Sequence, residues 1–178
     1  MYRSLRLSVP LLAWFVSTAA AVQEPVATRT VDEFRRSVPQ TMAPMALQVR
    51  MRWTTDAPFA DAAKTANHFQ LISARSVPVS IRPERAPEIG PATLLITSVT
   101  DDGREVDWRL VADPRMVRAE LDDDGQLRSK RLFYLDVQFV ALLPQLERVT
   151  QLRVYGVQRA KVGLIATPLG AVDLGDAR

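Results

Sequence analysis

An acidic segment at residues 120–125 carries the residue types of the first half of a calcium-binding loop. In such a loop the first, third and fifth positions supply oxygen ligands, the sixth is glycine and the twelfth is a bidentate glutamate. The first four requirements are met by Glu120, Asp122, Asp124 and Gly125, but the twelfth position is Arg131. Because a cation stands where the most demanding ligand belongs, we expect an acidic turn and no metal site.

His68 is the only histidine, and the chain has no cysteine. Zinc sites built from several histidines or cysteines, histidine relays, disulfides and iron–sulfur clusters are therefore excluded. A serine–histidine–acid triad would need His68 beside a nucleophilic serine, but no G-x-S-x-G turn or glycine-rich phosphate loop occurs. We thus predict no catalytic residue and no cofactor. A hydrolase built on two carboxylates from distant parts of the chain stays open as an alternative.

Two short helices are predicted in the first half of the chain. Thr30 and Glu33 have the spacing of a capping box, and a helix that begins there should end before Pro39. The second predicted helix covers residues 56–69, where apolar residues recur at helical spacing. It places His68 near its C-terminus, as a capping or surface residue.

From Leu47, and again after this helix, the chain alternates between apolar and polar residues, which is typical of half-buried strands. Turn signals at residues 101–103 and 122–125 separate some of these segments. Trp53 and Trp108 fall on the apolar faces of their segments and should be buried. The predicted strands are residues 47–53, 77–81, 93–99, 106–111, 117–121, 132–143, 152–157 and 162–166.

The stretch from residue 91 to residue 156 resembles the immunoglobulin-like or fibronectin-type sandwiches of secreted bacterial proteins. The residues that carry the resemblance are Leu94–Ile96, Asp101–Gly103, Trp108, Asp113–Arg115, Phe139–Pro144 and Leu152–Tyr155. The fold that we predict is mainly β: an antiparallel β-sandwich, immunoglobulin-like, with one or two short N-terminal helices.

The segment 132–143 is apolar on both faces, which a strand with one wet face would not be. Phe133, Leu135 and Val137 begin one face. The other face holds Leu132, Tyr134, Val140 and Leu142. Either the helix at residues 56–69 covers this second face, or the face is exposed and binds a partner.

The first 21 residues have the pattern of a cleaved signal peptide. Arg3 and Arg6 are followed by a short apolar run at residues 7–16, and Ala19 and Ala21 stand where a signal peptidase reads small residues. We expect a periplasmic or secreted protein without a membrane span after cleavage. Its predicted parts are residues 1–21 as signal peptide, 22–45 as a flexible segment with a short helix, 46–166 as the β-sandwich domain and 167–178 as a C-terminal tail.

Two of the 23 lysines and arginines, and none of the 20 acidic residues, lie within this signal peptide, so the remainder is almost neutral. A nearly balanced surface gives no basic stripe for nucleic acid. We expect an exported, non-catalytic binding or accessory module of the cell envelope, with an envelope or secreted protein as partner. The alternatives are a periplasmic or secreted hydrolase with a carboxylate-based site and a purely structural subunit.

Overall fold

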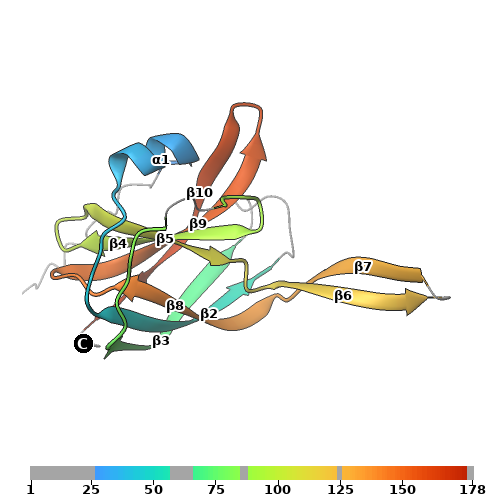
Figure 1. The fold of residues 1–178 in the computed structure, drawn as a ribbon, viewed down its shortest axis with the longest axis horizontal. Helices are drawn as coiled ribbons and strands as arrows, with labels where there is room; N and C mark the ends of the chain where they lie inside the picture. Colours follow the sequence, from blue (N-terminus) through green and yellow to red (C-terminus); the bar gives the residue numbers. More distant parts are fainter. Residues whose placement is uncertain (1–26, 57–65, 85–87, 124–125, 176–178) are drawn as a thin grey trace, which may run out of the picture.

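The computed structural model describes residues 27–56, 66–84, 88–123 and 126–175. Over these ranges the chain is mainly β, with antiparallel sheets and one short helix, as the sequence predicts (Figure 1). The predicted signal peptide lies outside the described residues. The elements are β1 (Arg29–Thr30), α1 (Val31–Ser37), β2 (Ala46–Thr55), β3 (Asn67–Val77), β4 (Thr93–Thr100), β5 (Glu105–Ala112), β6 (Met116–Asp123), β7 (Gln126–Phe133), β8 (Asp136–Pro144), β9 (Val149–Ala160) and β10 (Gly163–Asp173).

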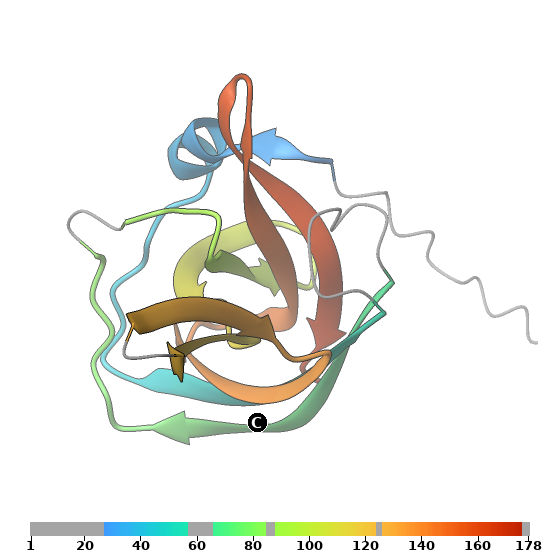
Figure 2. The ribbon, with the colours of Figure 1, turned by 90° about the vertical axis from the view of Figure 1, so that its right-hand side faces the viewer.

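The strands form three antiparallel sheets. A five-stranded sheet has the order β1-β10-β9-β4-β5, a three-stranded sheet has the order β3-β2-β8, and β6 pairs with β7 alone. The two larger sheets curve around a common interior, with β10 beside β3 (Figure 2). These two sheets and α1 are called the body. The β6–β7 hairpin, residues 116–133, projects from the body and is called the arm (Figure 1).

The interior between the two larger sheets is filled by alternate residues of the strands. On β2, Val49, Met51 and Trp53 are fully buried while Arg50 and Arg52 are exposed, because successive side chains of a strand point to opposite faces. The five-stranded sheet contributes a facing apolar layer that includes Leu94, Ile96, Leu152 and Val154. The two sheets therefore share one core.

The helix α1 begins at the predicted capping box. The Glu33 N–H donates to Thr30 Oγ1 at 3.2 Å, and the Thr30 N–H donates to Glu33 Oε2 at 3.0 Å. These two bonds satisfy backbone donors that the first turn of a helix leaves unpaired. The helix is seven residues long. Across the described residues no helix has the length and apolar character that a membrane crossing requires.

α1 covers the outer face of the five-stranded sheet. Phe34 is fully buried and meets the Tyr155 ring edge-on, with 5.5 Å between ring centroids. Trp108 of β5 is buried beneath the helix end and donates its indole N–H to the Val38 carbonyl at 2.9 Å. The predicted burial of Trp53 and Trp108 is confirmed. The five-stranded sheet is thus packed on both faces.

The β4–β5 hairpin turns where the sequence predicts. Gly103 has a φ of 81°, which residues with a side chain rarely adopt, and its N–H donates to the Thr100 carbonyl at 2.8 Å. The Thr100 N–H in turn donates to the Arg104 carbonyl at 3.0 Å. The glycine at this position therefore closes the turn and fixes the register of the two strands.

The predicted helix at residues 56–69 is wrong at its C-terminal end, because β3 begins at Asn67. Residues 57–65 lie outside the described part. His68 stands opposite Thr54 in the β2–β3 ladder, and the Phe69 ring stacks on Trp53 with 5.0 Å between centroids. Pairing with β2 and burial against Trp53 outweigh the local helical pattern, since strand formation depends on such distant neighbours.

The predicted single strand at residues 132–143 is also wrong. β7 ends at Phe133 and β8 begins at Asp136. Between them the Tyr134 N–H donates to the Arg115 carbonyl at 3.1 Å, and the Leu135 carbonyl accepts from the Thr55 N–H at 2.9 Å. The first bond continues the β6–β7 pairing and the second continues the β2–β8 pairing, so the chain passes from the arm to the body at Tyr134 and Leu135.

The last strand is longer than predicted. β10 continues beyond Ala166 to Asp173 and includes residues that we expected in a C-terminal tail. The added residues pair with the first half of β9, where Asp173 stands opposite Gln151. A break in register between Pro168 and Gly170 bends the strand. This bend brings Gly170 against the ring of Phe69, so the end of β10 helps to close the core.

Candidate functional site

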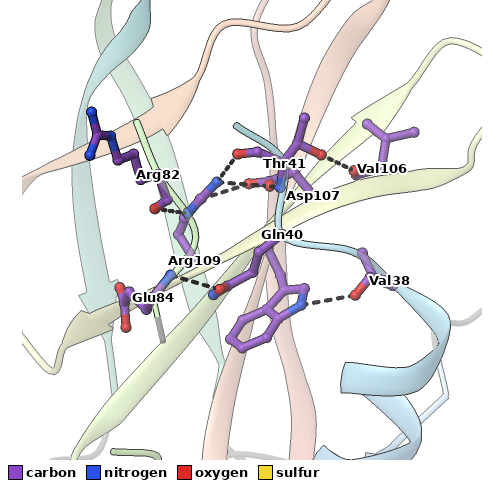
Figure 3. A network of polar contacts seen from close by, with 9 residues as sticks. Val38, Gln40, Thr41, Arg82, Glu84, Val106, Asp107 and Arg109 are labelled. Atoms are coloured by element: carbon purple, nitrogen blue, oxygen red, sulfur yellow. Dashed lines mark hydrogen bonds and ion pairs between the residues drawn. The ribbon is translucent and has the colours of Figure 1, made fainter. Parts of the chain in front are cut away.

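The most buried ion pair of the body lies on β5. Asp107 is fully buried, and its two oxygens accept from Nε and Nη2 of Arg109 at 3.0 and 3.1 Å. Arg109 also donates to the Arg82 carbonyl at 2.9 Å and to the Thr41 carbonyl, while the Thr41 N–H donates to Asp107 at 2.5 Å (Figure 3). The pair therefore holds two connecting segments, one before β2 and one after β3, against the edge of β5.

The protonation of Asp107 is set by its burial. Removal from water raises the pKa of Asp107 to about 6, against the opposing effects of the Thr41 amide and the Arg109 guanidinium. All three guanidinium nitrogens of Arg109 donate within this network. A pair whose polar groups are used in this way is suited to hold the fold together, and it offers no free group to a substrate.

A second polar cluster lies on the outer face of the five-stranded sheet. Glu105 accepts from Arg29 at 2.5 Å, from Thr97 at 3.0 Å and from the Tyr155 hydroxyl. Burial, followed by the hydrogen bond to Glu105, raises the pKa of Tyr155 well above its usual value, so the hydroxyl stays protonated at neutral pH. The Arg29 guanidinium also lies over the Phe34 ring at 4.3 Å. This cluster fastens β1 and α1 to the sheet.

The third ion pair lies where the arm leaves the body. Arg115 donates to both oxygens of Asp113, at 3.1 and 2.8 Å, and its guanidinium carbon lies 3.6 Å from the centroid of the Trp53 ring. Both charged side chains are largely buried. A guanidinium over an indole face is attracted by the ring quadrupole. The chain is therefore held firmly just before β6, and the arm has a fixed root.

Among the described residues, the arm meets the body at this root and at the exit at Tyr134 and Leu135. Its strands pair with each other, from Met116 opposite Phe133 to Asp123 opposite Gln126. Apart from that pairing, β6 and β7 make no extensive contact with any other described element. Such an uncovered hairpin is marginally stable by itself in water. The core of the body therefore does not explain why the chain forms the arm.

The four residues predicted as a partner face are all exposed, so the expectation that a helix at residues 56–69 covers them is wrong. Tyr134 is 54 % exposed and Leu142 is 43 % exposed. The structure divides the four between two places. Leu132 and Tyr134 lie at the exit of the arm, while Val140 and Leu142 lie on the outer face of β8.

The structure adds two exposed apolar residues to the exit of the arm that sequence reasoning did not select. Val117 stands opposite Leu132 in the β6–β7 ladder, and both are exposed. Leu135, which we placed on a buried face, is exposed as well. Leu135 departs from the assigned alternation because the chain changes sheets there, whereas Phe139 and Ala141 of the same assigned face are buried on β8. A continuous apolar run gave no signal of that break.

The acidic segment 120–125 falls at the tip of the arm. β6 ends at Asp123 and β7 begins at Gln126, and residues 124 and 125 lie outside the described part. Within the described ranges, no three acidic, histidine or cysteine side chains are grouped as metal ligands. The sequence-based expectation of a plain acidic turn stays a prediction.

The chain was compared with family models, with curated proteins and with solved structures. None of the three comparisons gave a match. Any functional argument therefore depends on the chain's own geometry.

Proposed function

We propose that this chain is an exported, non-catalytic binding or accessory module of the cell envelope, and that the arm and its exit form the binding element. The observation that carries the proposal is an uncovered hairpin with exposed apolar residues at its exit, namely Val117, Leu132, Tyr134 and Leu135. Exposed apolar groups that lie together mark interaction sites. The signal-peptide pattern of residues 1–21 supports the expected periplasmic or secreted location.

The hydrolase alternative receives less support from the described carboxylates. Glu105, Asp107 and Asp113 are the acidic residues with the least exposed side chains, and each accepts a hydrogen bond from an arginine. An acid–base pair needs carboxylates that can exchange protons with a substrate. The arginine contacts instead fix connecting segments in place, which favours the binding role.

We also propose a sandwich-like architecture for the body. It is supported by a core to which both larger sheets contribute. In the seven-stranded immunoglobulin order, the first strand lies at a sheet edge and pairs with the second alone. Here β2, the first long strand, lies between β3 and β8. The resemblance therefore extends to two facing antiparallel sheets, while the position of β2 differs.

The binding proposal is tested by affinity capture from the producing cell's own envelope, with Tyr134→Asp and Leu132→Asp compared with the unmodified protein. Both side chains are exposed, so the free energy of unfolding of each variant should lie within about 0.5 kcal/mol of the parent's, as is usual for surface substitutions. The envelope proteins that the unmodified protein captures should no longer be captured by either variant. Val162→Asp, at a highly exposed position in the β9–β10 turn, is the matched control and should keep them. Unchanged capture by both test variants would contradict the proposal.

A further inference from the structure

Each strand of the arm has one edge that the hairpin does not pair. β6 pairs with β7 from Met116 to Asp123, and no third strand joins this sheet in the part of the chain that the structure describes. A free strand edge presents backbone N–H and C=O groups that can pair with another chain. Sheets of three or more strands are also more stable than an isolated hairpin. The arm would therefore gain from a further strand.

The two edges of the arm differ in charge. β7 contains Arg128, Lys130 and Arg131 and no acidic residue. Two copies of β7 placed side by side would bring like charges together, and cations on edge strands are one means by which proteins prevent such pairing. β6 contains both Arg118 and Glu120. Of the two edges, β6 is the one whose charges permit pairing with its own copy.

The sequence of β6 is self-complementary around Ala119. In an antiparallel pair centred on the two Ala119 residues, Arg118 stands opposite Glu120 of the second copy, and the same pair occurs again across the two-fold axis. Val117 likewise stands opposite Leu121 of the second copy, and only the outermost pair, Met116 opposite Asp122, is not matched. Opposite charges and apolar residues that face each other across strands stabilise a sheet.

Neighbouring registers lack this match. Centring the pair on Arg118 or on Glu120 would place two like charges opposite each other at the axis, which destabilises a sheet. A slip of one residue would place Arg118 opposite Leu121 and Val117 opposite Asp122 of the second copy, so that both the opposite-charge pair and the apolar pair are lost. The register centred on Ala119 is therefore favoured over those beside it.

We infer that two copies of this chain associate through the free edge of β6, in the register centred on Ala119, to form a four-stranded antiparallel sheet. The order of this sheet is β7-β6-β6-β7, with the two-fold axis at its centre. The inference rests on the proposed function, in which the arm is a binding element, and it names a second copy of the chain as a partner of that element.

The test uses native mass spectrometry of the purified protein and of two charge-reversal variants. The unmodified protein should be a dimer. Glu120→Arg places arginines opposite each other in both pairs, and Arg118→Glu does the same with glutamates, so each variant alone should be monomeric. An equal mixture of the two restores opposite charges at both pairs. It should therefore form a dimer that contains one copy of each variant.

Lys130→Glu is the matched control, because β7 is an outer strand of the four-stranded sheet, and this variant should remain dimeric. A monomeric unmodified protein, variants that stay dimeric alone, or a mixture without mixed dimers would each overturn the inference. If the unmodified protein is monomeric while Tyr134→Asp still loses envelope capture, the second-copy inference fails and the proposed function stands. Mixed dimers together with unchanged capture by Tyr134→Asp and Leu132→Asp would support the second-copy inference and contradict the proposed function.

Discussion

The five-stranded sheet and the arm are both antiparallel. The five-stranded sheet is covered on its two faces by α1 and by the three-stranded sheet, whereas the body leaves the arm uncovered. Leu95, Ile96 and Tyr155 of the larger sheet are fully buried, some against the three-stranded sheet and some against α1. Val117 and Leu132 of the arm face each other and are exposed. Packing within the chain therefore accounts for the larger sheet. The arm requires another explanation, and we propose that it binds a partner.

The largest loss of stability is expected from a substitution in the five-stranded sheet, which is covered on both faces. Trp108→Ala removes a buried ring that packs edge-on to Phe34 and donates to the Val38 carbonyl. Deletion of a large buried aromatic side chain costs about 3–5 kcal/mol of the free energy of unfolding. Urea denaturation measures this change. A folded variant with nearly unchanged stability would mean that α1 and this sheet do not form a packed unit.

A pH-dependent loss of nearly the same size is expected from the Asp107–Arg109 pair. Because burial raises the pKa of Asp107 to about 6, from an ordinary value near 3.8, the native state favours the protonated carboxyl. The stabilisation that Asp107 contributes to the native state is fully present below pH about 4 and is lost as the pH rises through about 6. Each pKa unit corresponds to about 1.4 kcal/mol, so the loss approaches about 3 kcal/mol.

The measurement is the difference in unfolding free energy between the parent and Asp107→Asn across this pH range. The asparagine does not titrate, so the parent should lose stability relative to the variant as the pH rises. Other acidic groups cancel in the difference. Asp136→Asn is a control of opposite sign. The hydrogen bond from Arg52 holds the pKa of Asp136 below its usual value, so the parent should gain stability relative to this variant as the pH rises. An NMR titration midpoint for Asp107 near pH 4 would contradict this prediction.

A smaller loss is expected where β10 closes the core. A Cβ atom added at Gly170 would lie 2.9 Å from the Phe69 ring, which is held by its stack on Trp53. Gly170→Ala should therefore cost about 1–3 kcal/mol, the usual range for overpacking. Gly90→Ala is the matched control, because a Cβ at Gly90 meets nothing within 4 Å. Equal thermal midpoints for the two variants would show that this part of the body is loosely packed.

Local patterns in the sequence predicted what local chemistry decides. The capping box of Thr30 and Glu33 and the turn at Gly103 depend on residues a few positions apart, and both form as expected. The alternation on β2 likewise predicted the burial of Trp53. In each case the physical cause lies within one element or one turn.

Contacts between distant residues produced the failures. The spacing of Phe69 fits a helical stripe as well as a strand, and only its stack on Trp53 distinguishes them. The break at Tyr134 and Leu135 is set by partners at Arg115 and Thr55, which the apolar run does not reveal. The stack of Arg115 on Trp53, which fixes the arm at its root, joins residues 62 positions apart. These long-range contacts decide where the candidate site lies.

The most direct test of the comparison is removal of the arm. The Tyr134 N–H already bonds to the Arg115 carbonyl at 3.1 Å, which is the closing bond of a two-residue turn. An asparagine–glycine pair can therefore replace residues 116–133 without moving the body. We predict that the free energy of unfolding changes by less than about 0.5 kcal/mol while envelope capture and dimer formation are lost. An unfolded or strongly destabilised protein would contradict the account, because the arm would then be part of what holds the body together.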